Sequence, residues 1–65
     1  QMSAETKYFV TKFLRESGKY IITYGDSMSD YYMLKEADEG YLVLRENGQV
    51  SKSLKNIDLG GIEIV

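Results

Sequence analysis

The chain contains neither cysteine nor histidine. Disulfides, thiolate or imidazole metal sites, zinc ribbons, and Ser-His or Cys-His catalysis are therefore excluded for these 65 residues. Any metal that the chain binds must be held by oxygen ligands.

Clustered basic residues and long apolar runs are also lacking. Eight basic and ten acidic residues give a net charge of −2, and the basic ones are scattered between Lys7 and Lys55. Because no basic patch is present to neutralise phosphates, nucleic acid is not an expected partner. No apolar run approaches the ~20 residues that cross a bilayer, and no signal-peptide pattern is present, so a membrane is not expected either. The default expectation is a cytoplasmic protein.

The length limits how much core the chain can build. A domain of 65 residues buries only about 60% of the surface that its unfolded chain exposes. Its core is marginal unless a metal or a partner adds stability. No linker, repeat or low-complexity stretch divides the sequence, which predicts a single partial domain over residues 1–65.

The first part of the chain predicts a helix followed by a strand. Over residues 4–17 the apolar residues recur at helical spacing, which places Phe9 and Phe13 in the core. Gly18 is expected to end this helix. Residues 20–24 are apolar or β-branched at every position, which is typical of a parallel strand covered on both faces.

The remainder predicts further alternation of helix and strand. A helix is expected over 29–37 and a strand over 40–44, which together make a right-handed βαβ crossover. Asn47-Gly48 is a turn signal, and residues 49–51 are a possible return strand of a hairpin. Residues 62–65 alternate like a short final strand. The expected class is α/β: a partial Rossmann-like unit of about three mostly parallel strands with two helices.

The most informative segment is Gly25-Asp26-Ser27-Met28-Ser29-Asp30, which follows the apolar run directly. It places Asp26 and Asp30 at a strand-to-helix corner, and ligands of open α/β sheets bind beyond the carboxyl ends of the strands. Two carboxylates about 4 Å apart would repel by roughly 4 kcal/mol at an effective dielectric of 20, so a close pair favours a cation. Oxygen ligands at such a corner suit Mg²⁺.

Simpler explanations exist for the same residues. Ser27 and Asp30 fit a capping box, and an acidic residue early in a helix is favoured by the helix dipole. Asp26 gains nothing from helix formation, so capping does not account for it. Lys7 lies near the amino end of a helix, where a positive charge is mildly unfavourable. It is either a solvated surface lysine or a functional residue, with Lys12 as a weaker candidate for the same role.

Residues 19–41 resemble the C-terminal metal-binding motif of haloacid dehalogenase-like phosphatases. The shared pattern is an apolar strand, Gly-Asp-Ser, a second Asp, Met-Leu, and Ala-Asp before a Gly, and the resemblance runs roughly from Thr6 to Val43. It implies that Asp26 and Asp30 bind Mg²⁺, that Lys7 steadies the nucleophile and the phosphoryl group, and that Ser27 contributes to substrate binding. It also implies hydrolysis of a phosphorylated small molecule.

The family's nucleophile segment, Asp-x-Asp-x-Thr after the first strand, does not occur in these residues, nor does its second motif. The resemblance therefore implies the C-terminal part of a haloacid dehalogenase-like hydrolase that is inactive alone. A non-catalytic module for assembly or binding is the alternative. The strand at 20–24 is expected to have a bare edge, which predicts a homo-oligomer or a complementary N-terminal fragment as partner.

Overall fold

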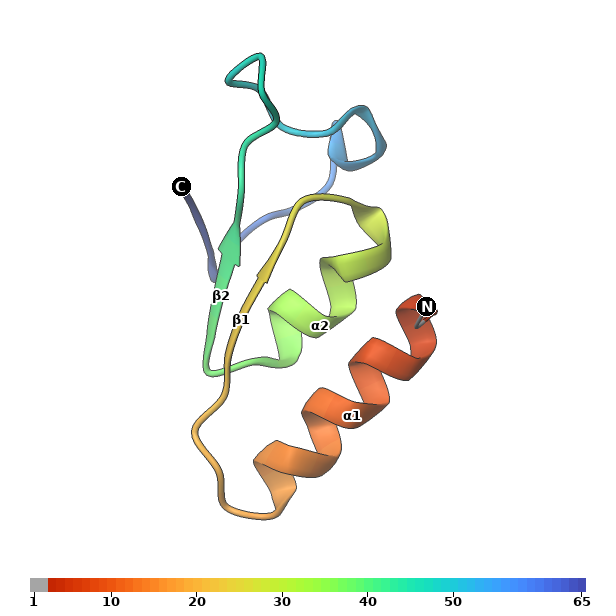
Figure 1. Cartoon of the computed structure of the whole chain (residues 1–65), viewed down its shortest axis with the longest axis vertical. Helices are drawn as coiled ribbons and strands as arrows, with labels where there is room; N and C mark the ends of the chain where they lie inside the picture. Colours follow the sequence, from red (N-terminus) through yellow and green to blue (C-terminus); the bar gives the residue numbers. More distant parts are fainter. Residues whose placement is uncertain (1–2) are drawn as a thin grey trace.

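The helices lie on one side of a parallel β-sheet in the computed structural model, which describes residues 3–65 (Figure 1). Its three strands are β1 (Ile22–Gly25), β2 (Glu39–Leu42) and β3 (Ile62–Ile64), in the order β1-β2-β3. Both strand pairs are parallel. The helices are α1 (Ala4–Glu16) and α2 (Tyr31–Glu36), with short 3₁₀ helices over Met28–Asp30 and Lys52–Leu54. The α/β expectation is confirmed, including the parallel β1-α2-β2 crossover.

The residues that flank helix α1 cap its two ends. The Ser3 hydroxyl accepts a hydrogen bond from the Thr6 amide at 3.2 Å and so caps the first turn. Gly18 has a φ of +89°, and its amide donates to the Arg15 carbonyl at 2.9 Å. A side chain at this left-handed position would be strained, so the predicted glycine stop is confirmed.

A small core forms between α2, the sheet and the second 3₁₀ helix. Its buried side chains are Leu34, Leu42, Leu54 and Ile62. Gly40 allows α2 to approach β2 closely, because a Cβ there would lie 2.3 Å from the Leu34 carbonyl oxygen.

Two expectations about burial are wrong. Phe9 and Phe13 were expected in the core, but they are 55% and 70% exposed, since α1 turns Thr11 inward instead. Strand β1 was expected to be covered on both faces, but Ile22 and Tyr24 are 49% and 64% exposed. Both errors concern side chains that have no neighbouring layer within residues 3–65.

Some element boundaries also differ from the expectation. The helix expected at 29–37 begins as the 3₁₀ turn, and α2 ends at Glu36. The return strand expected at 49–51 does not form. Instead, the Arg45 amide donates to the Gln49 carbonyl at 2.9 Å and the Gly48 amide donates to the Arg45 carbonyl at 2.8 Å, which closes a turn. The final strand is confirmed as β3.

Candidate functional site

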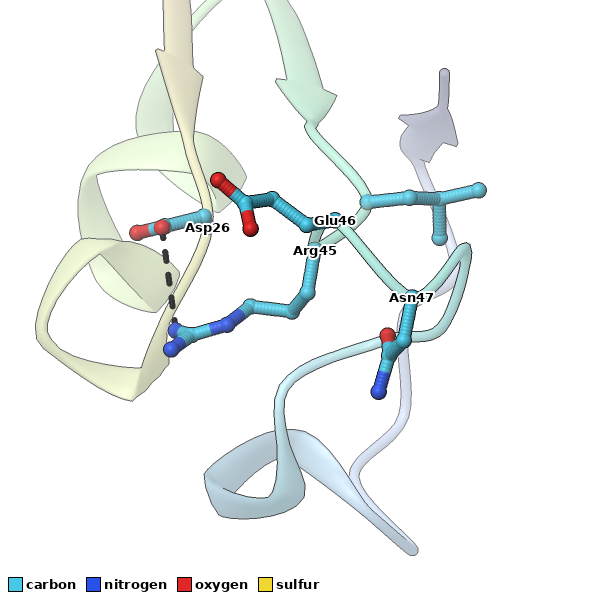
Figure 2. Close-up of a pocket in the computed structure, with 5 residues that line it drawn as sticks. Asp26, Arg45, Glu46 and Asn47 are labelled. Atoms are coloured by element: carbon cyan, nitrogen blue, oxygen red, sulfur yellow. Dashed lines mark ion pairs between the residues drawn. The ribbon is translucent and has the colours of Figure 1, made fainter.

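The candidate site lies at the carboxyl ends of β1 and β2. Asp26 follows the last residue of β1, and Arg45 lies on the loop after β2. Together with Leu44, Glu46 and Asn47 they line a shallow hollow. Figure 2 shows the Arg45 side chain extending toward Asp26. This is the edge of a parallel sheet at which ligands are expected.

Asp30 is buried, at 8% exposure, and links α1 to the end of β1. Its Oδ1 accepts a hydrogen bond from Lys7 Nζ at 2.8 Å, and its Oδ2 accepts one from the Asp26 amide at 3.1 Å. The structure thus brings together Lys7, Asp26 and Asp30, three of the four site residues selected from the sequence.

Gly25 makes room for this arrangement. A Cβ on Gly25 would lie 2.4 Å from the Asp30 Cβ and 2.8 Å from its Oδ2. No real Cβ contact is that short, so only glycine lets the Asp30 carboxylate lie beneath the end of the strand.

The electrostatics of Asp30 follow from these contacts. Burial alone would raise the pKa of this carboxyl group. The hydrogen bond and charge of Lys7, together with the backbone amides of Asp26 and Ser27, outweigh burial and lower the pKa below its ordinary value. Asp30 is therefore ionised at neutral pH, and its charge is matched by Lys7.

Asp26 has a different environment. Its side chain is 56% exposed, and Oδ2 lies 3.8 Å from Arg45 Nη1. The two carboxylates expected to share one cation therefore each have their own basic partner. Within residues 3–65 no group of three or more acidic side chains is arranged to hold a metal. Mg²⁺ commonly uses only one or two protein carboxylates and completes its shell with water and phosphate oxygens, so this donor set still fits it.

Ser27 directly follows Asp26. Its hydroxyl lies 2.9 Å from that of Ser29 and does not cap the helix that follows, so the Ser27 half of the capping-box interpretation is wrong. The Asp30 half is confirmed, because the Asp30 carboxylate accepts from the backbone amides of Asp26 and Ser27. The substrate-binding role of Ser27 stays a prediction.

Asp38 lies outside the site, at the amino ends of β1 and β2. Its carboxylate accepts from the Ile21 amide at 2.8 Å and lies 3.3 Å from Arg15 Nε, so it holds the loop before β2 against the start of β1 and the end of α1. Arg45 was missed by the sequence analysis. Its position just past a parallel strand, at the same edge as Asp26, was the available signal. Lys12, the weaker alternative to Lys7, instead lies over the Tyr8 ring, 5.9 Å from its centroid.

Comparisons of the chain with protein-family models, curated proteins and solved structures found no match. Among residues 3–65 no helix has the length and apolar character needed to cross a membrane. The chemistry that the site can support follows from its own side chains. These are the exposed Asp26 carboxylate beside Arg45, and the Lys7 ammonium that is held by the buried Asp30.

Proposed function

We propose that this chain is the C-terminal part of a haloacid dehalogenase-like hydrolase and contributes Mg²⁺ ligands and a phosphate-site lysine to the hydrolysis of a phosphomonoester. The observation that carries the proposal is the hydrogen-bonded chain that runs from the Lys7 ammonium through the Asp30 carboxylate to the Asp26 backbone amide, at the carboxyl end of β1. Lys7 lies 23 positions before Asp30, and the fold brings its ammonium to one of the two carboxylates that the resemblance assigns to Mg²⁺.

Asp26 is the side chain best suited to hold Mg²⁺. The Asp26 carboxylate is exposed at the mouth of the hollow, and its contact with Arg45 is long and solvated. Asp26 can therefore exchange its contact with Arg45 for one with Mg²⁺ at little cost in free energy. When bound, Mg²⁺ would orient a phosphate and offset the charge that builds up during phosphoryl transfer. That Asp30 also reaches the ion remains a prediction. A carboxylate has about four lone-pair positions, and two of those on Asp30 are already used.

Lys7 is held so that it can still bind an anion. Its ammonium carries three N–H donors, one of which is given to Asp30 Oδ1. The remaining donors are available to oxygens of a phosphoryl group, and the partly buried position, at 22% exposure, strengthens such contacts relative to bulk water. Asp30 thus acts as a positioning residue for the lysine.

The topology indicates where a nucleophile would enter. Both α1 and α2 lie on the same face of the sheet, and α2 belongs to a crossover from β1 to β2 (Figure 1). Because parallel crossovers are right-handed, a strand that precedes α1 in this sheet would lie beyond the free edge of β1. A carboxylate at the end of that strand would be next to Asp26 and near Lys7. This supports a phosphoaspartyl mechanism completed by a segment outside these residues.

The alternative, a non-catalytic assembly or binding module, is favoured by a different observation. Several large apolar side chains on α1 and β1 are exposed, which is typical of surfaces that bind a partner. Both functions require a partner segment, but only the hydrolase requires a metal site at Asp26.

Titration of the ¹⁵N-labelled chain with MgCl₂ tests the proposal. We expect amide shifts at Asp26, Ser27 and Asp30 in the millimolar range, and their loss in Asp26→Asn. Glu16→Gln is the matched control, because it removes an exposed acidic side chain at the far end of α1. Equal shifts in Asp26→Asn, or none in the parent chain, would remove the metal claim.

A second experiment tests the catalytic claim directly. The chain is co-expressed with the polypeptide encoded immediately upstream of it. We expect Mg²⁺-dependent hydrolysis of p-nitrophenyl phosphate, lost in Asp26→Ala and Lys7→Ala. Activity that needs neither Mg²⁺ nor these residues would contradict the proposal, and the absence of activity would leave the binding module.

A further inference from the structure

One face of the sheet is not covered by α1 or α2, which both lie on the other side (Figure 1). Tyr24, Tyr41 and Glu63 are in register across the three strands, and side chains two residues apart share a face. The open face therefore consists of Ile22, Tyr24, Glu39, Tyr41, Val43 and Glu63. Its apolar members are well exposed, with Ile22 at 49%, Tyr24 at 64% and Val43 at 41%.

Next to the open face, the backbone edge of β1 that points away from β2 is also free. The Ile21 and Gly25 carbonyls accept from the Glu39 and Val43 amides, so alternate residues of β1 direct their backbone groups toward β2. The backbone groups of Ile22 and Tyr24 consequently face the free edge. Parallel sheets occur almost only with both faces covered, and contiguous exposed apolar patches mark interaction sites. The sheet therefore requires a partner on this face.

The open face also carries fixed negative charge. Glu39 accepts hydrogen bonds from the hydroxyls of Tyr20, at 2.6 Å, and of Tyr41. The Tyr41 ring stacks on Tyr24, with centroids 5.2 Å apart. These two hydrogen bonds lower the pKa of Glu39, and Glu63 adds a second carboxylate beside Tyr41. None of the six residues is basic, so the face is apolar with two uncompensated acidic groups.

We infer that the open face binds an amphipathic helix of a partner polypeptide, whose apolar stripe is bordered by lysine or arginine. Neighbouring strands lie about 4.8 Å apart and rise about 3.3 Å per residue, so three strands of this length present a face of about 10 by 13 Å. A helix is about 10 Å wide and advances about 5.4 Å per turn, so two to three turns of one helix cover the face. Its apolar side chains contact Ile22 and Tyr24, and its basic ones reach Glu39 and Glu63.

A second copy of the chain does not provide such a helix. Its exposed apolar helical surface is the flank of α1 formed by Phe9, Val10 and Phe13. Glu5, Lys12 and Glu16 lie within one turn of Phe9 or Phe13 on that helix, so this flank carries two acidic groups and one basic group. Docking α1 on the open face would place a flank of net negative charge against Glu39 and Glu63, which disfavours the contact. The inference does not depend on the proposed hydrolase function, because it involves neither Asp26 nor a metal.

Three synthetic helical peptides test the inference on the ¹⁵N-labelled chain. Two share the same leucine stripe, bordered by lysine in one and by glutamate in the other, and the third is a scrambled version of the lysine peptide. We expect the first to shift Ile22, Tyr24, Tyr41 and Val43, and the glutamate peptide to bind about tenfold more weakly. Glu63→Lys should weaken the lysine peptide about three- to tenfold, whereas the control Glu16→Lys on α1 should change binding less than twofold.

Other outcomes would overturn the inference. Equal binding of the scrambled peptide would show attraction by net charge alone. Shifts confined to α1, or no shifts at millimolar peptide, would show that the open face does not bind a basic helix. The last measurement is the sedimentation of the chain without any peptide. A concentration-dependent dimer, with dilution shifts at the same residues, would assign the face to a second copy. The Mg²⁺ titration would be unaffected by any of these results.

Discussion

The ion pair between Lys7 and Asp30 should be a major contribution to the stability of this small domain. The two side chains are 22% and 11% exposed, and the atoms are 2.8 Å apart. Fully exposed ion pairs contribute about 0.2–1 kcal/mol, whereas hydrogen bonds to charged groups contribute about 1.5–3 kcal/mol. For this intermediate burial we expect a coupling energy of about 1–2 kcal/mol. A chain of this length has a free energy of unfolding of only about 3–10 kcal/mol, so the pair is a large fraction of it.

A double-mutant cycle of Lys7→Met, Asp30→Asn and both together measures this coupling by urea denaturation. With a denaturant slope of about 1 kcal/mol/M, the coupling appears as a non-additive difference of about 1–2 M in the midpoints. Asp30→Asn should cost more than Lys7→Met, because it leaves the ammonium without its counter-charge and weakens the hydrogen bond from the Asp26 amide. Lys12→Met combined with Asp30→Asn is the control and should be additive. A coupling energy below about 0.3 kcal/mol between Lys7 and Asp30 would refute the reasoning.

Three further predictions concern the same chain. The lowered pKa of Asp30 implies a contribution to stability that is fully present above the unfolded value, 3.8, and is lost as the pH falls through the lower folded value. Thermal unfolding measured from about pH 5 to about pH 2 should show this loss, and Asp30→Asn should flatten it. Gly25→Ala should destabilise the fold by about 1–3 kcal/mol, since its Cβ would displace Asp30 from Lys7, and an unchanged urea midpoint would argue against this packing. Tyr41 should titrate in ultraviolet absorbance near its pKa of about 12, because its hydroxyl is bonded to Glu39. The stability that this hydrogen bond contributes is present below pH 10.0 and is lost as the pH rises through about 12. Glu39→Gln should bring the titration back toward 10.0.

The class of fold was predictable because its signals are local. The apolar run before Gly25, the helical spacing before Gly18, and the turn at Asn47-Gly48 each depend on a few neighbouring residues. The burial of Phe9 and Phe13 was not predictable in the same way. Helical spacing shows that these residues share a face, but it does not show whether the layer facing them belongs to this chain.

The candidate site was predictable in part. Asp26 and Asp30 were selected because a strand end followed by a helix defines a sheet edge, and Lys7 was selected by resemblance. The direction of each carboxylate was not accessible, because it depends on a contact across 23 positions and on the missing Cβ of Gly25. Arg45 was missed although it directly follows the strand expected at 40–44, because a single arginine in a polar loop is a weak signal.

The exposed surfaces of the chain converge on β1. Its outer edge has no neighbour within residues 3–65, its open face exposes Ile22 and Tyr24, and the flank of α1 that carries Phe13 is also uncovered. Asp26 directly follows this same strand. A strand that pairs in parallel with β1 would cover this outer edge and, in the same step, bring its own carboxyl end beside Asp26 and Lys7. Completion of the sheet and completion of the candidate site are therefore one event. A variant that blocks pairing, such as Ile22→Pro, should abolish complementation by an upstream segment. The same variant should leave Asp26 free to bind Mg²⁺ in the isolated chain. Retained complementation in that variant would show that the nucleophile enters from elsewhere.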